Sequence, residues 1–225
     1  MDKLQILCFG DSNTWGCIGN WTETTVPTRR YDMDTRWTCV LQADLDEGFH
    51  IVEEGLGGRS TIYTREGEEY KSGEFYLKPC LHSHRPLDLV IIMLGTNDLQ
   101  IKKDITLEEL PIGISRLVDI VRENPNVGRD QIAPKVLILS PAEIRPSSPE
   151  GRVLVYDKFR RDIGRELSLK FPEVYAKVAQ EKGCYFFDAA AYIEPGPADG
   201  VHLTPESHIR LGHALADYIR ENIFR

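Results

Sequence analysis

Residues 4–16 read LQILCFGDSNTWG, and they predict a strand that ends in a tight turn. Leu4–Phe9 is an apolar run of strand length, and Gly10-Asp11-Ser12-Asn13 contains only residues that favour turns. Open α/β sheets place their active crevice outside the carboxyl ends of the strands. Ser12 is therefore either part of an ordinary turn or a nucleophile, and other segments of the chain must decide between the two.

Strand-like and helix-like segments alternate along the rest of the chain. Leu89–Leu94 is apolar at every position, as expected for a central parallel strand with two buried faces. The expected strands are Leu4–Phe9, His50–Glu53, Leu87–Leu94, Lys135–Leu139 and Cys184–Phe187. The expected helices are Arg36–Leu45, Gly73–His84, Leu107–Glu123, Leu167–Lys182 and Pro205–Phe224. This alternation predicts a doubly wound parallel sheet with helices on both faces.

Several residues indicate where these helices begin. Thr35 is the expected N-cap of the first helix, and a capping box begins at Thr106. Thr204 is the expected N-cap of the last helix, with Pro205 at its first position. Pro172 is expected in the first turn of its helix or at a kink.

Composition narrows the class of protein. The chain has 225 residues, 41% of them hydrophobic, which is enough for one domain with a sizeable core. A net charge of −8 argues against a nucleic-acid-binding surface. We expect no membrane span and no secretory signal, because the chain runs directly into a short strand. Five scattered cysteines without a C-x-x-C pair predict a reduced, cytoplasmic protein, with Cys8 and Cys184 as small buried apolar residues.

Three further segments carry polar or glycine residues near expected strand or helix ends. Gly55-Leu56-Gly57-Gly58 follows the second strand and permits outward-pointing N–H groups. Gly95-Thr96-Asn97-Asp98 follows the central strand and offers an amide donor. Asp199 and His202 precede the last helix, at a spacing that lets the carboxylate orient the imidazole. Alone, each segment is more simply a turn, a cap or a loop histidine.

Their shared position distinguishes these segments from ordinary turns. In a doubly wound sheet all of them open on the edge where Ser12 lies. A nucleophile, N–H donors, an amide donor and an Asp–His pair are the parts that acyl transfer requires. The Gly-x-Ser-x-Gly elbow of α/β-hydrolases is absent, since Thr14 occupies its second glycine position. The remaining histidines are expected to be structural or superficial: His50, His82, His84, His208 and His213.

In order and spacing, the four segments resemble the sequence blocks of the SGNH (GDSL-type) hydrolases over nearly the whole chain. Within that family the chain is most similar to the bacterial arylesterase/acyltransferase subgroup. The stretches that carry this similarity are Ile6–Ser12, Arg36-Trp37-Thr38, Val52–Leu56 and Leu87–Asp98.

The resemblance implies a flavodoxin-like three-layer α/β/α sandwich with a five-stranded parallel sheet, one domain over residues 1–225, and no metal or other cofactor. It implies Ser12 as nucleophile, His202 as general base and Asp199 as the residue that orients it. It also implies a homo-oligomer, an octamer being one such assembly.

The resemblance further implies an oxyanion hole built from the N–H of Ser12, the N–H of Gly58 and the side chain of Asn97. Gly58 is preferred to Gly57 because Gly58-Arg59-Ser60-Thr61 aligns with the family's Gly-x-x-Thr, but both glycines remain candidates. Asp11 and Asp98 are expected to hold their loops without a direct part in the reaction.

The expected substrate is a small acyl ester, aryl or alkyl, with transfer to an alcohol or to peroxide as an additional outcome. Asn13, which replaces the family's Leu, and Trp15 are expected in the substrate pocket, and Trp21 and Tyr31 are further candidates for its wall. Trp37 and Phe9 are expected in the core. Alternatives are a carbohydrate acetylesterase, a lysophospholipase or thioesterase on the same fold, and, more remotely, a non-catalytic flavodoxin-like binding module.

Overall fold

Five strands and nine helices account for most of the residues that the computed structural model describes, which are 3–19, 29–147 and 154–225. The strands are β1 (Leu4–Gly10), β2 (Phe49–Gly55), β3 (Leu89–Met93), β4 (Lys135–Leu139) and β5 (Tyr185–Phe187). The helices are α1 (Ser12–Trp15), α2 (Trp37–Asp44), α3 (Gly73–Ser83), α4 (Asp98–Ile101), α5 (Leu110–Arg122), α6 (Leu154–Lys158), α7 (Asp162–Ser168), α8 (Phe171–Lys182) and α9 (Pro205–Tyr218).

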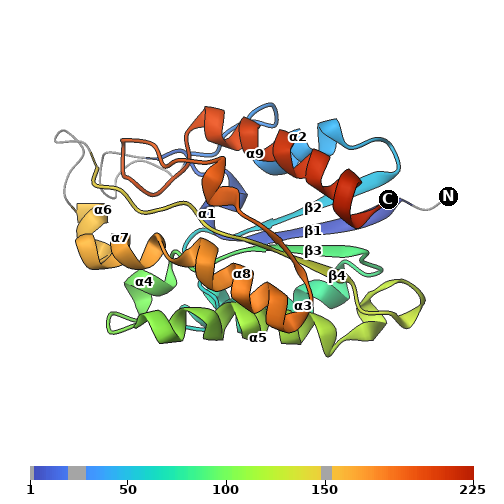
Figure 1. Cartoon of the computed structure of the whole chain (residues 1–225), viewed down its shortest axis with the longest axis horizontal. Coiled ribbons are helices and arrows are strands. Elements are labelled where there is room, and N and C mark those ends of the chain that lie inside the picture. Colours follow the sequence, from blue (N-terminus) through green and yellow to red (C-terminus); the bar gives the residue numbers. More distant parts are fainter. Residues whose placement is uncertain (1–2, 20–28, 148–153) are drawn as a thin grey trace.

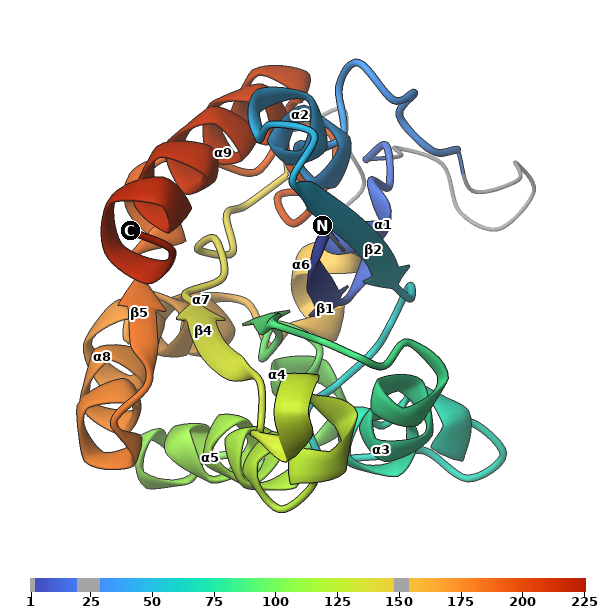
Figure 2. The same cartoon turned by 90° about the vertical axis from the view of Figure 1, so that its right-hand side faces the viewer.

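The strands form one parallel sheet in the order β2-β1-β3-β4-β5, with helices on both faces. Helices α2 and α9 cover one face, and α3, α5 and α8 cover the other (Figure 1 and Figure 2). The strand order reverses direction at β1, as in flavodoxin-like folds, so the crevice forms beyond the carboxyl ends of β1 and β3. The expected three-layer sandwich is confirmed.

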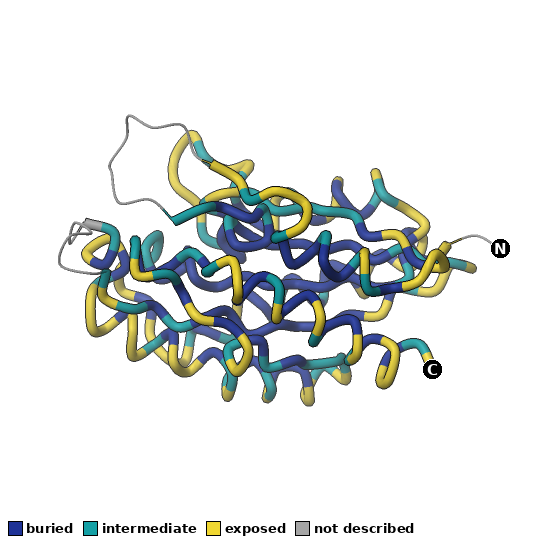
Figure 3. The backbone as a smooth tube through the Cα atoms, turned by 90° about the horizontal axis from the view of Figure 1, so that it is seen from above, coloured by how far each residue is buried: buried dark blue, intermediate teal, exposed yellow. Residues whose placement is uncertain are grey.

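The period-2 pattern of β1 explains why both faces are covered. Ile6 and Cys8 pack with α2 and α9, whereas Leu7 and Phe9 pack with α3, α5 and α8. A strand that is apolar on both sides exposes unfavourable surface unless helices bury each side. Figure 3 shows the resulting core as a dark band of buried chain through the middle of the molecule. Trp37 is fully buried in it, as expected.

Helix starts follow the sequence signals in three of four cases. Thr204 caps α9 by accepting from the N–H of Ser207, with Pro205 at the first position. The capping box at Thr106 forms, but it opens a 3-10 turn, Leu107–Glu109, that leads into α5. Pro172 lies in the first turn of α8.

The N-cap expected at Thr35 is wrong. Arg36 occupies the N-cap position, while the hydroxyl of Thr35 donates to Asp32. The guanidinium of Arg36 donates Nε and Nη2 to the two carboxylate oxygens of Glu53, both at 3.0 Å. This bidentate pair anchors the start of α2 to β2 without a side-chain cap.

The structure also bears on two further expectations, the burial of Cys8 and Cys184 and the absence of a membrane span. Cys8 is fully buried, and Cys184 is only partly buried at the margin of the core. Among residues 3–19, 29–147 and 154–225, no helix has the length and apolar character needed to cross a bilayer.

Candidate active site

The register of the sheet brings the first three predicted segments to one edge. Gly10, the last residue of β1, pairs with Gly55 of β2 and Met93 of β3. Ser12 lies two residues beyond this row, Gly57 and Gly58 lie just beyond Gly55, and Asn97 follows Met93. The short helices α1, α4, α6 and α7 gather at this end of the sheet (Figure 1).

Ser12 begins the one-turn helix α1. Asp11 caps this helix, since its carboxylate accepts the N–H of Asn13 at 2.9 Å. Gly55 allows the helix to pack on the end of β2, because a Cβ at that position would lie 2.1 Å from the backbone nitrogen of Trp15. The turn expected at Gly10–Asn13 is thus a strand-to-helix turn that presents the serine at the sheet edge.

A continuous chain of contacts links Ser12, His202 and Asp199. Ser12 Oγ lies 3.0 Å from His202 Nε2, and His202 Nδ1 lies 2.6 Å from Asp199 Oδ2. The second carboxylate oxygen of Asp199 accepts the N–H groups of Val201 and His202 at 3.0 and 2.9 Å. These three acceptor contacts hold the carboxylate in one orientation, which in turn fixes the plane of the imidazole.

The pKa values of this pair shift in opposite directions. Burial raises the pKa of Asp199, but its contacts with His202 prevail and lower it below the usual value. Burial lowers the pKa of His202, but interactions with Asp199 and, after it, Cys17 prevail and raise it above that of a free histidine. The carboxylate therefore stabilises the imidazolium that forms when His202 takes a proton.

Two glycines lie in a turn beside Ser12. The N–H of Arg59 donates to the carbonyl of Leu56 at 3.0 Å, which closes a turn with Gly57 and Gly58 at its centre. Gly58 has a φ of 79°, a value typical of the third position of a type II turn and one that side-chain-bearing residues rarely adopt. Both glycines line the same cavity as Ser12, so the geometry retains both as candidate donors.

The amide of Asn97 is held by three neighbours. Its Nδ2 donates to the carbonyl of Arg59 at 3.0 Å and to Asp11 Oδ2 at 3.3 Å, while its Oδ1 accepts from Gln100 at 2.5 Å. The long contact to Asp11 is the weaker of the two donated bonds.

Asp98 and Asp11 connect the loops, as expected from the sequence. Asp98 accepts the N–H and the hydroxyl of Thr61, each at 2.8 Å, and so ties the end of β3 to the segment after β2. Burial raises the pKa of Asp98 to about 7 and that of Asp11 to about 6, although hydrogen bonds from Thr61 and Asn13, respectively, act against the rise. Neither residue lines the cavity at Ser12.

Asn13 does not line the cavity, which corrects the expectation that it forms part of the pocket wall. Its side chain is 4% exposed and points into the protein. It donates to the carbonyl of Val201 at 3.2 Å and accepts the N–H of Leu203 at 3.0 Å. An amide can make both bonds at once, whereas the leucine of the family motif can make neither. Asn13 therefore connects the serine helix to the backbone on both sides of His202.

The cavity at Ser12 has a volume of about 320 Å³ and is lined by five apolar or sulfur-bearing side chains, five polar side chains and two glycines. Trp15 is one of the residues that line it. Tyr31 does not line it, and Trp21 lies outside the described residues. Six lining residues were not expected from the sequence: Val201, beside His202, and Cys17, Gln100, Val155, Lys158 and Phe159. None of the six belongs to a catalytic motif, and only the fold brings α4 and α6 beside Ser12.

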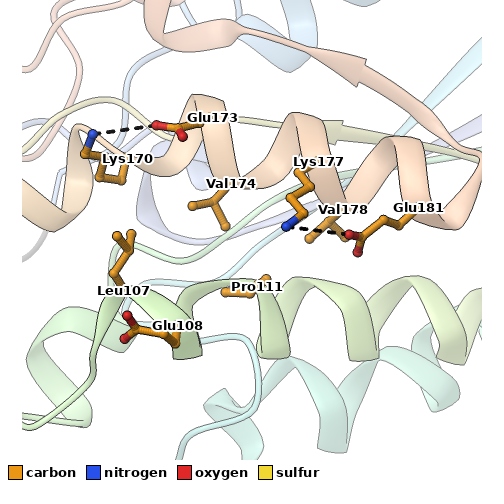
Figure 4. Close-up of a pocket in the computed structure, with 9 residues that line it drawn as sticks. All are labelled: Leu107, Glu108, Pro111, Lys170, Glu173, Val174, Lys177, Val178 and Glu181. Carbon is orange, nitrogen blue, oxygen red and sulfur yellow. Dashed lines mark ion pairs between the residues drawn. The ribbon is translucent and has the colours of Figure 1, made fainter.

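One groove and one cluster of possible metal ligands lie away from the cavity at Ser12. The groove in Figure 4 lies between α8 and the start of α5, and Lys170–Glu173 and Lys177–Glu181 form ion pairs along it. Within the described residues, Glu54, Cys80 and His84 form the one trio with ligand atoms mutually within 4.8 Å, a spacing that could hold a metal ion. In this structure His84 Nε2 contacts the Glu54 carboxylate at 2.8 Å, and none of the three lines the cavity.

The comparisons agree with this geometry. Residues 8–209 match the model of the GDSL-like Lipase/Acylhydrolase family. A carbohydrate acetylesterase from Sinorhizobium meliloti is 39% identical, with a TM-score of 0.88, and the match covers 97% of this chain and 99% of that one. An aryl esterase from M. smegmatis is 38% identical, with a TM-score of 0.87 and the same coverage. A putative arylesterase from Agrobacterium tumefaciens is 35% identical, with a TM-score of 0.83 and again the same coverage. No match was found among curated proteins.

These matches span nearly the whole of each chain, and they support an enzyme rather than the non-catalytic binding module. The site brings together a serine, a histidine and an aspartate at hydrogen-bonding distances. The chain belongs to the GDSL-like lipase/acylhydrolase family, also called SGNH hydrolases, and is a carboxylic ester hydrolase.

Proposed function

We propose that Ser12, His202 and Asp199 form a catalytic triad that hydrolyses esters of small acyl groups through an acyl-enzyme. The observation that carries this proposal is the chain of contacts from Ser12 Oγ to His202 Nε2 and from His202 Nδ1 to Asp199, at 3.0 and 2.6 Å. A nucleophile, a base and an orienting carboxylate in this order are the recurring arrangement of serine hydrolases.

In the proposed reaction, Ser12 Oγ attacks the ester carbonyl while His202 Nε2 takes its proton. The N–H groups of Ser12 and Gly58 and the Nδ2 of Asn97 donate to the oxyanion. His202 then gives the proton to the leaving alcohol, and the C–O bond breaks to leave an acyl group on Ser12. Water attacks this acyl-enzyme by the same route and releases the acid.

The lining of the cavity supports small aryl or alkyl esters as substrates. Trp15, Val155, Phe159 and Val201 present apolar surface beside Ser12. Apolar walls with a few polar groups near the reacting atoms are typical of sites for small molecules. The second candidate is a carbohydrate acetylesterase, because one of the similar structures carries that name.

A fluorophosphonate label and a panel of esters test the proposal. We expect the label to react with the wild-type protein and not with Ser12→Ala, and p-nitrophenyl acetate and butyrate to be cleaved faster than the octanoate. Equal labelling of the two proteins contradicts the proposed nucleophile. Faster cleavage of acetylated sugars than of p-nitrophenyl acetate favours the carbohydrate acetylesterase.

We further propose that residues 1–225 act as one catalytic domain in a homo-oligomeric, cytoplasmic enzyme. The five cysteines are all free thiols, which supports a reducing compartment. Light scattering on the purified protein tests the assembly, and a mass equal to one chain contradicts it.

A further inference from the structure

A second hollow adjoins the cavity at Ser12. It has a volume of about 510 Å³ and is lined by Arg65, Gln100, Ile101, Lys103, Asp157, Lys158 and Arg160. Gln100 and Lys158 line both spaces. The two spaces are therefore neighbours across these two side chains, and we call the second one the basic hollow.

The basic hollow has an excess of positive charge. Four cationic side chains line it, against the single carboxylate of Asp157. Arg161 already neutralises that carboxylate, with Nε and Nη2 at 2.5 and 3.1 Å from its oxygens. The groove of Figure 4 differs, because it holds two lysines against three glutamates and pairs them internally.

The cations of the basic hollow differ in how far they are neutralised. Arg65 donates to Gln100 Oε1 at 3.1 Å and lies 3.7 Å from Glu68, and Arg160 donates to the carbonyl of Ile105 at 3.1 Å. Within the described part of the chain, the side chains of Lys103 and Lys158 make neither a hydrogen bond nor an ion pair. These two ammonium groups are the ones available to a ligand.

The backbone beside Lys158 is held in an uncommon conformation. Arg160 and Arg161 have φ values of 68° and 53°, in the left-handed region that arginine rarely adopts. The N–H of Arg161 donates to the carbonyl of Tyr156 at 3.0 Å and so ends α6 at this point. Strain of this kind persists only where the surrounding contacts impose it, and it is concentrated at functional sites.

The net charge of the whole chain is opposite in sign to the charge of the basic hollow. With a net charge of −8, the chain as a whole repels anions. A local group of unpaired lysines beside a nucleophile therefore selects where an anion approaches.

We propose that the basic hollow binds an anionic group, a carboxylate or a phosphate, of an ester whose carbonyl reaches Ser12. The enzyme then prefers esters that carry such an anion on the alcohol or the acyl side. This inference rests on the proposed esterase function and adds the charge class of its substrate. Lys103 and Lys158 supply the recognition, and Arg65 and Arg160 add to the field.

Matched pairs of esters test the proposal through kcat/KM. The alcohol-side pairs set 4-acetoxybenzoate and 4-acetoxyphenyl phosphate against neutral methyl 4-acetoxybenzoate. The acyl-side pair sets mono-p-nitrophenyl succinate against p-nitrophenyl butyrate. We expect at least one anionic member to be preferred by about tenfold at low ionic strength, with the preference shrinking at 0.5 M salt because exposed lysines are screened. The pair that shows the preference identifies the anion and the side that carries it.

Charge reversal provides the decisive comparison. In Lys103→Glu/Lys158→Glu the ratio of anionic to neutral kcat/KM should fall by about tenfold or more, since each ammonium becomes a carboxylate. Lys177→Glu, in the groove of Figure 4, is the matched control and should leave that ratio unchanged. Circular dichroism and fluorophosphonate labelling establish that each variant is folded and has a reactive serine.

The outcomes separate this inference from the esterase function. Cleavage of neutral and anionic esters at equal efficiency, or a preference that survives charge reversal, contradicts anion binding in the basic hollow. Either result leaves the esterase function intact. Absence of both ester cleavage and labelling in the wild type overturns the proposed function itself.

Discussion

Single side chains set both the position and the protonation of the groups around Ser12. Asp199 is the main example, because it accepts from His202 Nδ1 and from two backbone N–H groups with both of its oxygens. Loss of the negative charge of Asp199 changes the pKa of His202, whereas loss of its hydrogen-bond acceptors changes the orientation of the His202 imidazole. The two effects can be separated by the pH dependence of the reaction.

Asp199→Asn should move the acid limb of the kcat/KM profile to lower pH. Protonated His202 cannot take the proton of Ser12, so the wild-type rate falls as the pH drops through the His202 pKa. The Asp199 carboxylate raises that pKa above 6.5, and its loss lowers it again. The plateau should also fall by about 10³–10⁴-fold, as in comparable triads. Asp44→Asn, at the exposed Asp44–His213 pair, is the control and should change neither quantity.

Asn13→Ala should lower both kcat and stability. The substitution removes the link between the serine helix and the backbone at Val201 and Leu203, and it leaves buried polar groups without partners. We expect a loss of about 1–3 kcal/mol in the free energy of unfolding. We also expect a kcat lower by about 10-fold because Ser12 is misplaced, which corresponds to ~1.4 kcal/mol of activation free energy. Unaltered kcat and unfolding curves would show that the link is dispensable. Asn222→Ala, at an exposed asparagine, serves as control.

At the scale of elements, the contact between α1 and the end of β2 positions Ser12, the proposed nucleophile. This contact is possible because Gly55 has no side chain, and the register of β1 with β2 sets its height above the sheet. The same row of residues continues to Met93 in β3 and so to Asn97. The positions of Ser12 and Asn97 therefore both depend on the register of these strand ends.

Gly55→Ala should separate α1 from β2 and so reduce activity strongly. The new Cβ would meet Trp15 N at 2.1 Å and Trp15 Cα at 2.5 Å, which are backbone atoms that cannot rotate away. Overpacking of this kind costs about 1–3 kcal/mol or more. Thermal unfolding and kcat measure the two effects. Gly196→Ala is the matched control, because its nearest neighbour would lie at 3.5 Å and it should behave as wild type.

At the scale of the whole molecule, burial of a histidine between α9 and α2 makes stability depend on pH. His208 is fully buried, and its Nδ1 accepts the N–H of Trp37 at 3.4 Å. Burial lowers the pKa of His208 to about 3, with the charges of His202 and Arg36 adding to the effect. The unfolded chain binds a proton near pH 6.5, so this group destabilises the folded state increasingly as the pH falls from 6.5 toward 3.

His208→Gln should flatten the dependence of the unfolding free energy on pH. Between pH 6.5 and 5 the wild type should lose roughly 2 kcal/mol through this group, and the variant should not. Asp11 and Asp98 act in the opposite sense, because their raised pKa values stabilise the fold at low pH. Since both carboxyls remain in the variant, the difference between the two urea-denaturation series isolates His208. If the unfolding free energies of wild type and His208→Gln change with pH in parallel, His208 is not the source of the pH dependence. His213→Gln, at an exposed histidine, is the control.

The strands and the main helices could be predicted because each depends on local pattern. The apolar run from Leu89 to Met93 can be buried only in the centre of a sheet, and Thr204-Pro205 can begin a helix wherever it lies. The positions of Ser12, Asn97 and the Asp199–His202 pair followed from the rule that parallel strands end at one edge. These inferences need no knowledge of side-chain packing.

Contacts between distant segments could not be predicted, because their energies depend on neighbours that only folding brings together. The sequence marks Asn13 as a turn residue beside the nucleophile, yet its amide bonds residues 188 and 190 positions further along. Thr35 has the chemistry of an N-cap, but the bidentate Arg36–Glu53 pair anchors that helix instead. Lys158 carries no motif, and the packing of α6 against the sheet edge brings it into the cavity. Local propensity therefore determines the elements and the edge on which the chemistry occurs, while long-range burial and hydrogen bonding decide which side chains surround Ser12.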